Sequence, residues 1–228
     1  MSDPPQLTLD FDHRPSLAGD DFLVAPNNDE AVSWLDRWPH WPGPVLAIHG
    51  PVGCGKTHLA SVFAALSGAR VISAADLQLG ADPLDILGAA PAFVIEDAEA
   101  AAAGGEEDFL HLFNVIAETG RHLLLTSKTP PSRWPLGLPD LRSRLNSVLA
   151  VEIGAPGDAL IVAVLVKLFS DRQLRVDDEV IRYLSTRMDR SFEAARSLVD
   201  RIDRHALAAQ RNITVPLVRQ VLESEDKS

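Results

Sequence analysis

The chain has 228 residues, of which 46% are hydrophobic and 23% are charged. This length fits one large domain or a domain with a small appendage, and the composition excludes disordered, collagen-like and disulfide-rich chains. The net charge of −11 comes from 21 basic and 32 acidic residues, which argues against a free-standing binder of duplex DNA and favours protein partners.

Neither a membrane nor an oxidising compartment is indicated by the sequence. No apolar run approaches the roughly 20 residues that span a bilayer, and residues 1–15 lack the basic-then-apolar pattern of a secretory signal. A single cysteine, Cys54, excludes an intrachain disulfide and a cysteine-rich zinc site. We therefore expect a cytoplasmic protein in which any metal ion arrives with a ligand.

The first two thirds of the chain alternate short apolar runs with amphipathic stretches. Runs of about four apolar residues are typical of central strands that helices cover on both faces. The alternation predicts an α/β domain with a mostly parallel sheet and right-handed crossovers. An Ala- and Gly-rich stretch, 98–105, is expected to be a loop. The expected strands are 45–48, 70–72, 92–95, 123–125 and 148–151, and the expected helices include 83–88, 107–118 and 139–145.

From Pro156 onward the strand patterns stop and helical patterns replace them. We divide the chain accordingly into a mobile tail (1–17), an α/β domain (18–154) and a small helical lid domain (155–228). The tail has two adjacent prolines and no sustained period. The helices of the lid domain are expected at 158–171, 177–187, 190–209 and 214–223.

A phosphate-binding motif follows the first expected strand. Residues 50–57 fit G-x-x-x-x-G-K-[ST] at every fixed position, between a strand and an apolar helix. Glycines let the backbone wrap phosphates, Lys56 reaches the outer phosphates, and Thr57 offers a hydroxyl to Mg²⁺. We predict that ADP or ATP binds here with Mg²⁺, with Cys54 chemically inert. The expected contacts in the loop are Gly50, Val52, Gly53, Cys54, Gly55, Lys56, Thr57 and His58.

Polar residues close two further strands. Glu96 and Asp97 follow the strand at 92–95, where Glu96 would help to hold Mg²⁺ and Asp97 would orient an attacking water. Thr126 and Ser127 close the next strand. There Thr126 would either sense the γ-phosphate or merely end the strand.

These motifs together resemble the DnaA group of AAA+ ATPases and, within it, short regulators of the Hda type. The resemblance covers nearly the whole chain after residue 18. Its most specific parts are Gly-Lys-Thr-His-Leu at 55–59, Phe-Asn at 113–114 and Leu-Arg-Ser-Arg-Leu at 141–145. It implies the AAA+ architecture, in which an αβα core with a parallel sheet precedes a small all-helical lid.

The resemblance also implies roles for residues outside the phosphate loop. Arg144 matches the arginine finger that an AAA+ subunit inserts into the nucleotide site of its neighbour, and Arg142 matches less firmly. Arg190 matches a lid arginine that reports the nucleotide state, although its spacing also allows a pair with Asp189 or Glu193. The segment Phe22, Leu23 and Val24 resembles the one that packs against adenine.

The tail contains a candidate docking peptide. Residues 6–11, Gln-Leu-Thr-Leu-Asp-Phe, resemble the peptide by which bacterial proteins bind the β sliding clamp. Gln6 offers hydrogen-bond donors and acceptors, and Leu7, Leu9 and Phe11 offer apolar anchors. The alternative is a tail that packs on its own domain.

Two departures from DnaA bear on hydrolysis. Glu96 stands where DnaA has the first of two aspartates, and Lys128 stands where DnaA has an acidic residue. Because Mg²⁺ tolerates little geometric slack, we expect weak hydrolysis at most by this chain alone. The last residues are too acidic for a DNA-recognition helix, so DNA contact would be indirect, through the clamp.

The resemblance implies that the chain is a regulator of replication initiation. Docked on the clamp and holding ADP or ATP, the chain would offer Arg144 to ATP bound on DnaA. The alternatives are a helicase-loader-like AAA+ ATPase and a small P-loop kinase that phosphorylates a metabolite. Whether the chain forms a homodimer is left open.

Overall fold

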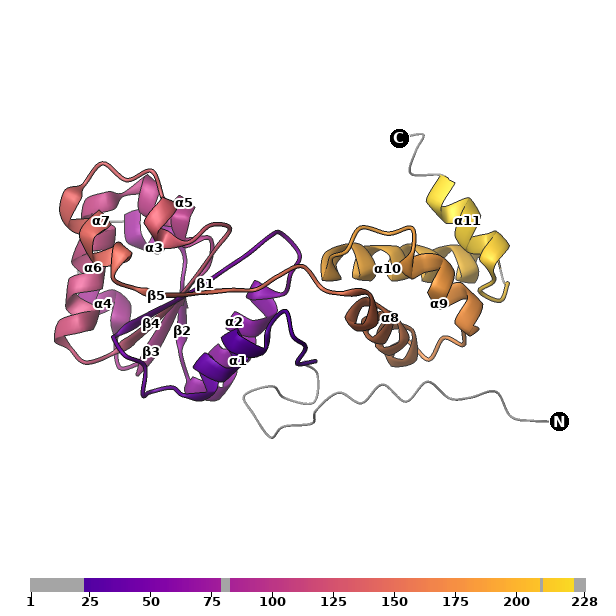
Figure 1. The fold of residues 1–228 in the computed structure, drawn as a ribbon, viewed down its shortest axis with the longest axis horizontal. Coiled ribbons are helices and arrows are strands. Elements are labelled where there is room, and N and C mark those ends of the chain that lie inside the picture. Colours follow the sequence, from indigo (N-terminus) through magenta and orange to yellow (C-terminus); the bar gives the residue numbers. More distant parts are fainter. Residues whose placement is uncertain (1–22, 79–82, 210, 224–228) are drawn as a thin grey trace. The chain divides into compact units, whose positions relative to one another are not determined.

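The structure is a computed structural model that describes residues 23–78, 83–209 and 211–223 (Figure 1). The chain folds into two compact units, with the boundary between Gly154 and Ala155. We refer to the described residues up to 154 as the α/β unit and to those from 155 as the helical unit. Among the described residues, no helix is long and apolar enough to cross a membrane.

A five-stranded parallel sheet forms the centre of the α/β unit, with strand order β2-β3-β4-β1-β5. The central strands are buried on both faces, as their continuous apolar runs predict. Alternate residues of β1 serve opposite faces: Val45 and Ala47 belong to one apolar cluster, and Leu46 and Ile48 to the other. The strands are β1 (Val45–His49), β2 (Arg70–Ile72), β3 (Ala92–Ile95), β4 (His122–Ser127) and β5 (Leu149–Glu152).

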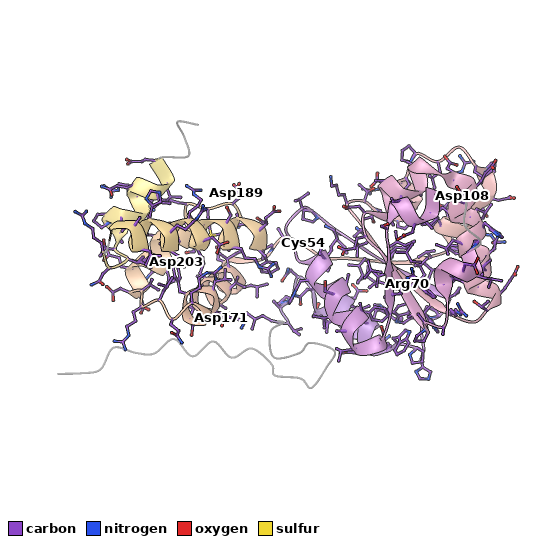
Figure 2. The ribbon with its side chains drawn as sticks, turned by 180° about the vertical axis from the view of Figure 1, so that it is seen from behind. Cys54, Arg70, Asp108, Asp171, Asp189 and Asp203 are labelled. Atoms are coloured by element: carbon purple, nitrogen blue, oxygen red, sulfur yellow. The ribbon has the colours of Figure 1, made fainter. Side chains whose placement is uncertain are left out.

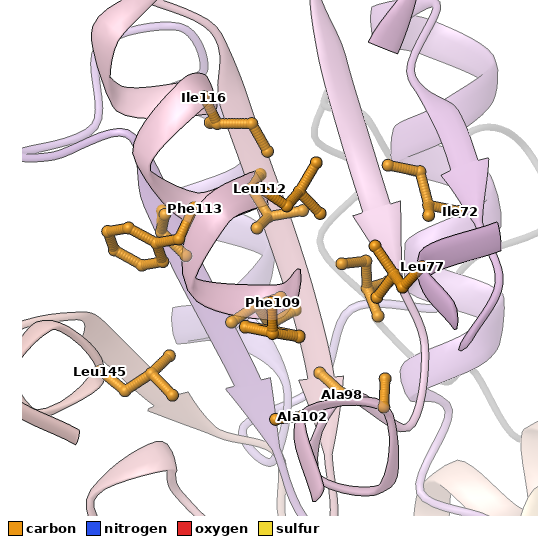
Figure 3. Packing of buried hydrophobic residues seen from close by; sticks show 14 of the residues in the cluster. Ile72, Leu77, Ala98, Ala102, Phe109, Leu112, Phe113, Ile116 and Leu145 are labelled. Atoms are coloured by element: carbon orange, nitrogen blue, oxygen red, sulfur yellow. The ribbon is translucent and has the colours of Figure 1, made fainter. Parts of the chain in front are cut away.

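Helices cover both faces of this sheet and complete three layers. Helices α1 (Asp29–Asp36) and α2 (Lys56–Ser67) pack on one face. On the other face, Phe109, Leu112 and Ile116 of α6 point at the strands (Figure 3). This second face is covered by α3 (Ala74–Gln78), α4 (Pro83–Leu87), α5 (Ala98–Gly104), α6 (Glu106–Glu118), the 3₁₀ helix η1 (Pro131–Arg133) and α7 (Pro139–Asn146).

The stretch 98–105 corrects one expectation, because it is helix α5 for most of its length and not a loop. Alanine has the highest helix propensity of all residues, and low complexity does not remove it. Ala98, Ala101 and Ala102 are buried in the cluster under α6, so this small-residue helix packs close to the sheet. The short helix α3 is likewise absent from the pattern-based prediction.

The helical unit contains α8 (Asp158–Asp171), α9 (Asp178–Ser185), α10 (Phe192–Ala209) and α11 (Val215–Glu223). Their apolar faces share one cluster that includes Leu165, Phe169 and Ile202. The four predicted helical ranges match these helices to within two residues at each end. The predicted fold class, a parallel αβα core followed by a helical lid, is therefore confirmed.

Candidate functional site

The carboxyl edge of the parallel sheet collects most of the predicted site residues of the α/β unit. Ile48 and His49 at the end of β1 pair with Thr126 and Ser127 at the end of β4. Ile95, the last residue of β3, pairs with Leu125 of β4, so Glu96 follows at the same edge. The phosphate-binding motif begins directly after His49 and therefore emerges beside these residues, as expected for ligand sites of parallel sheets.

The loop 50–55 requires glycine at its first position. Gly50 has φ 157°, and a Cβ placed on it would lie 2.1 Å from the carbonyl oxygen of Ile153. Its own N–H donates to the carbonyl oxygen of Ser127 at 3.2 Å, which joins the loop to β4. The backbone of this loop thus runs against two strand ends with no room for a side chain.

Helix α2 starts at the end of this loop without a side-chain cap. Gly55 occupies the N-cap position with φ 102°, a left-handed conformation that favours glycine. The N–H groups of the first helical turn have no intrahelical partner, and here no side chain caps them. Such a helix start, preceded by a glycine-rich loop, suits an anionic ligand.

Lys56 folds back over the loop. Its Nζ donates hydrogen bonds to the carbonyl oxygens of Gly50 and Pro51, each at 2.8 Å, and lies 3.8 Å from Cys54 Sγ. The ammonium group is therefore held at the mouth of the loop by acceptors that the loop itself supplies. A phosphate oxygen entering the loop would be a stronger, charged acceptor for the same donors.

Cys54, labelled in Figure 2, is a buried free cysteine in the apolar cluster that includes residues of α1 and α2. Burial raises its pKa, and the nearby Lys56 ammonium opposes that shift only in part. Because the thiolate is the nucleophilic form, this environment suits packing and not chemistry. The other predicted loop residues are more open: Val52 and Thr57 are exposed, and Gly53 and His58 are half-buried.

The two acidic residues after β3, Glu96 and Asp97, differ in exposure and in backbone conformation. Glu96 is half-buried, whereas Asp97 is exposed and has φ 47° and ψ 43°, a left-handed conformation. The carbonyl oxygen of Asp97 accepts the N–H groups of Ala100 and Ala101 at the start of α5. The two neighbouring carboxylates therefore leave the chain from different backbone conformations, consistent with separate tasks.

A divalent cation would find only part of its ligands among the described residues. Among the residues that the structure describes, no three His, Cys, Asp or Glu side chains are grouped as a metal site. The exposed Thr57 and the half-buried Glu96 supply a hydroxyl and a carboxylate at the same edge. This oxygen set fits Mg²⁺, which is commonly bound by one or two protein ligands, phosphates and water.

Thr126 and Ser127 are almost fully buried, at 2% and 0% exposure. Thr126 lies on the face that α2 covers, because it alternates with Leu124 of that cluster. Ser127 Oγ donates to the carbonyl oxygen of Thr129 at 2.7 Å, which shapes the turn that leaves β4. These two residues end the strand rigidly beside the phosphate loop.

Two asparagines, Asn27 and Asn28, fix the segment before α1. Asn28, 2% exposed, accepts the Ala25 N–H at 2.9 Å and donates to the Leu23 carbonyl oxygen at 3.0 Å. Asn27 exchanges hydrogen bonds with Gly154, at 3.0 and 3.1 Å. Leu23 and Val24 are consequently half-buried and held near the end of β5. Phe22, the third residue predicted for this segment, lies outside the described residues.

His49 carries a charge environment that the motif does not reveal. Burial lowers its pKa, Glu152 acts in the opposite direction, and Arg133 and Lys56 lower it further. Arg133 belongs to η1, so this helix brings an additional cation towards the end of β1. The motif gives no signal for Arg133, because this residue lies far from the loop in sequence.

The two arginines of α7 are exposed. The guanidinium carbon of Arg144 lies 5.9 Å from the centre of the ring of Phe113, a buried residue of α6. Within the described residues no carboxylate forms an ion pair with Arg144 or Arg142. Arg144 therefore lies against an aromatic ring, and no carboxylate of the described residues pairs with its guanidinium.

Arg190 belongs to the helical unit and forms an ion pair there. Its guanidinium lies 2.9 Å from Asp158 Oδ1 at the start of α8, and not on Asp189 or Glu193, the two partners that its spacing offered. Both side chains are well exposed, so the pair is weak and easily exchanged. Gln6, Leu7, Leu9 and Phe11 of the candidate docking peptide lie outside the described residues.

Comparison with known proteins finds one family model, for the helical unit, and a relative that spans most of the chain. A family model described as the lid domain of Hda matches residues 158–222. An uncharacterised protein of Haemophilus influenzae is 29% identical over 195 residues, which cover 78% of this chain and 81% of that protein.

Solved structures of DnaA and RuvB share the fold. Domain III of the Thermotoga maritima replication initiation protein DnaA matches with a TM-score of 0.78 at 18% identity, covering 92% of this chain and 97% of that chain. AMPPCP-bound DnaA from Aquifex aeolicus matches with a TM-score of 0.64 at 22% identity, covering 85% of this chain and 66% of that chain. The Thermotoga maritima RuvB branch migration motor matches with a TM-score of 0.63 at 20% identity, covering 80% of this chain and 61% of that chain.

Proposed function

We propose that this chain is a DnaA/Hda-like AAA+ protein that regulates the initiation of DNA replication by binding ADP or ATP and promoting hydrolysis of ATP on DnaA. The proposal is supported by the Hda lid model that matches residues 158–222 and by the likeness of the fold to domain III of DnaA. The observation that carries the proposal is the exposed guanidinium of Arg144, which no carboxylate of the described residues neutralises.

Nucleotide binding is supported by the phosphate loop and its surroundings. The Gly50 backbone is pressed against two strand ends, the first turn of α2 has no side-chain cap, and Lys56 is held over the loop. In the proposal the loop backbone and Lys56 contact the phosphates of ADP or ATP, with Leu23 and Val24 against the base. Mg²⁺ would be held by Thr57, Glu96 and the phosphates, and it would offset phosphate charge. Arg190 would exchange Asp158 for a phosphate.

Hydrolysis by the chain itself is expected to be weak. Glu96 is longer than the aspartate of DnaA, and a Mg²⁺ site is sensitive to the distance at which a carboxylate reaches it. Asp97 is the second carboxylate and is exposed, so a water that it orients would not be shielded from solvent. The bound nucleotide would then act mainly as a structural ligand.

Arg144 would act on a second protein. An arginine finger supplied in trans contributes on the order of 10³-fold or more to phosphoryl transfer, because its planar fork stabilises charge on the transferring group. A free guanidinium on the surface can reach a nucleotide held by a partner, whereas an ion-paired one would first have to break its bridge. The partner in this proposal is DnaA carrying ATP.

Docking on the β sliding clamp would bring the chain to DNA without direct DNA contact. The proposal rests on the sequence of residues 6–11, in which Gln6, Leu7, Leu9 and Phe11 would be the contacts. The α/β portion of the chain (residues 1–154) has 9 basic and 20 acidic residues, which disfavours direct binding to DNA. Tethering would raise the local concentration of Arg144 near DnaA.

The test measures ATP hydrolysis by DnaA with clamp-loaded DNA and this protein. Arg144→Ala should lower the stimulated rate at least a hundredfold, and Arg144→Lys should restore little, because an ammonium lacks the planar fork. Arg142→Ala is the matched control on the same helix and should keep most of the stimulation. Unchanged stimulation with Arg144→Ala would refute the role of Arg144.

The clamp and the nucleotide are tested separately. A Gln6→Ala/Phe11→Ala double variant should lose retention on immobilised clamp but keep its affinity for ADP and ATP. Retention equal to that of the unaltered protein would contradict docking through residues 6–11. Binding to a replicative helicase in place of the clamp would instead indicate a helicase loader.

A further inference from the structure

Helix α7, which carries Arg144, is anchored at its start by a residue from another helix. The two carboxylate oxygens of Glu106, the first residue of α6, accept the backbone N–H groups that precede α7. Oε1 accepts from Gly137 at 2.9 Å, and Oε2 accepts from Leu138. Leu138 is the N-cap residue of α7 and makes no side-chain capping bond, so Glu106 satisfies donors that α7 does not satisfy itself.

The connection from β4 to α7 is fixed at a second point as well. The carbonyl oxygen of Thr129 accepts hydrogen bonds from Ser127 Oγ at 2.7 Å and from Trp134 Nε1 at 3.0 Å. Trp134 is buried, with its ring edge-on to Phe109 of α6 at 6.5 Å. The segment 128–138 is therefore held at two points: Trp134 packs on α6, and Glu106 binds the backbone at residues 137 and 138.

We propose that Glu106 is a positioning residue that sets the placement of α7, and thereby the direction in which Arg144 leaves the surface. The inference rests on the proposed function, in which Arg144 acts on a nucleotide held by DnaA. Glu106 itself would touch neither the nucleotide nor DnaA.

The chemistry of the anchor supports this role. A carboxylate that accepts two backbone N–H groups makes charge-assisted hydrogen bonds, which are shorter and stronger than neutral ones. These two bonds lower the pKa of Glu106, so the anchor is ionised throughout the neutral range. A helix of eight residues such as α7 is marginal by itself, so a misplaced first turn would displace the whole helix and the guanidinium near its end.

Small errors of placement have large effects on catalysis. A displacement of about 1 Å at a catalytic group can lower a rate about 100-fold. Loss of the anchor should therefore reduce the rate at saturation more than it reduces binding to DnaA. A residue needed only for stability would lower both together with the melting temperature.

The experiment compares variants of the full chain in DnaA-dependent ATP hydrolysis, titrated to saturation. Glu106→Ala should lower the maximal rate at least tenfold, with less than a threefold change in the half-saturating concentration. Glu106→Gln keeps one carbonyl acceptor and the length of the side chain, so it should recover part of the rate. Glu107→Ala, at the exposed neighbouring position on α6, is the matched control and should behave like the unaltered protein.

Arg144→Ala, measured in parallel, separates the two proposals. If Arg144→Ala abolishes stimulation while Glu106→Ala and Glu106→Gln both retain the full maximal rate, the positioning role is wrong and the proposed function stands. If Arg144→Ala retains full stimulation, the proposed function fails and the positioning role falls with it. A parallel loss of maximal rate, half-saturation and melting temperature in both Glu106 variants would also overturn the positioning role.

Discussion

The ammonium group of Lys56 and the carbonyl oxygen of Gly50 lie 2.8 Å apart, so the lysine is held over the loop in which phosphates would sit. A second carbonyl, that of Pro51, holds the same group at 2.8 Å. The positive charge is consequently placed before any ligand arrives, and only its acceptors have to be exchanged.

Replacement of this lysine should remove nucleotide binding. Hydrogen bonds to charged groups are worth about 1.5–3 kcal/mol each, so losing two of them in Lys56→Ala should weaken ADP and ATP about a hundredfold or more. Titration of a fluorescent adenine nucleotide measures the affinity. Lys167→Ala, in the helical unit and paired with Asp171, should bind like the unaltered protein, and equal affinities of the two variants would contradict the assignment.

Gly50 should be irreplaceable for a different reason, which is space. A Cβ at this position would lie 2.1 Å from the Ile153 carbonyl oxygen, and backbone cannot yield as a flexible side chain can. Gly50→Ala should therefore destabilise the α/β unit by roughly 3 kcal/mol. Gly43→Ala, where a Cβ would meet nothing within 4 Å, should change stability by less than about 0.5 kcal/mol. Denaturant unfolding of both variants measures the difference, and equal midpoints would show that the loop can shift.

Trp38 and Trp41 form a natural pair for measuring one hydrogen bond. Both pack on Phe63 of α2, with ring centres at 6.0 and 5.5 Å. Trp41 Nε1 donates to the Trp34 carbonyl oxygen at 2.8 Å, whereas Trp38 Nε1 is buried with no partner among the described residues.

Substitution of either tryptophan by phenylalanine removes the indole N–H and about the same side-chain volume. We expect Trp41→Phe to cost about 1 kcal/mol more than Trp38→Phe, because only Trp41→Phe removes a hydrogen bond. The part-buried Trp34 carbonyl oxygen would then keep only the Arg37 N–H, at 3.2 Å. The free energies of unfolding of the two variants give the difference directly. If Trp38→Phe costs more, its indole N–H has a partner that offsets its burial.

The predictability of each feature follows from how local its cause is. Val45–His49 and Ala92–Ile95 are strands because their apolar runs are long enough to be buried on both faces, and this pattern is complete within a few residues. The phosphate loop is equally local, since its glycines, lysine and threonine are adjacent in sequence. The fold class and the loop are therefore predictable from the sequence alone.

Features that depend on distant residues are not predictable in this way. Glu106 is indistinguishable from its acidic neighbours on α6 until the chain brings Gly137, 31 residues away, against it. Asn27 has the character of a turn or cap residue, and its bond to Gly154 spans 127 residues. The alanines of α5 combine a high helix propensity with the low complexity of a loop, and their burial in the cluster with α6 favours the helix.

Protonation of His49 couples the loop region to pH. Burial is the largest effect on His49 and lowers its pKa in the folded protein; Glu152 opposes it, and Arg133 and Lys56 add smaller effects that lower the pKa further. The unfolded chain, with a histidine pKa of about 6.5, therefore binds the proton more readily than the folded one. The stability that follows from this difference is complete above about pH 6.5 and is lost as the pH falls through the lower, folded pKa.

The four tryptophans, residues 34, 38, 41 and 134, all belong to the α/β unit, so their fluorescence reports the unfolding of that unit alone. The urea concentration at the unfolding midpoint of the unaltered protein should decrease when the pH is lowered from 7.5 to 5.5. His49→Asn should reduce this fall, since Asn does not titrate, whereas His40→Asn, at an exposed position in the same unit, should leave it unchanged. Burial also lowers the pKa of His122, so some pH dependence of stability should remain in His49→Asn. If the urea midpoint decreases equally in His49→Asn and in the unaltered protein, the neutral form of His49 does not contribute to stability.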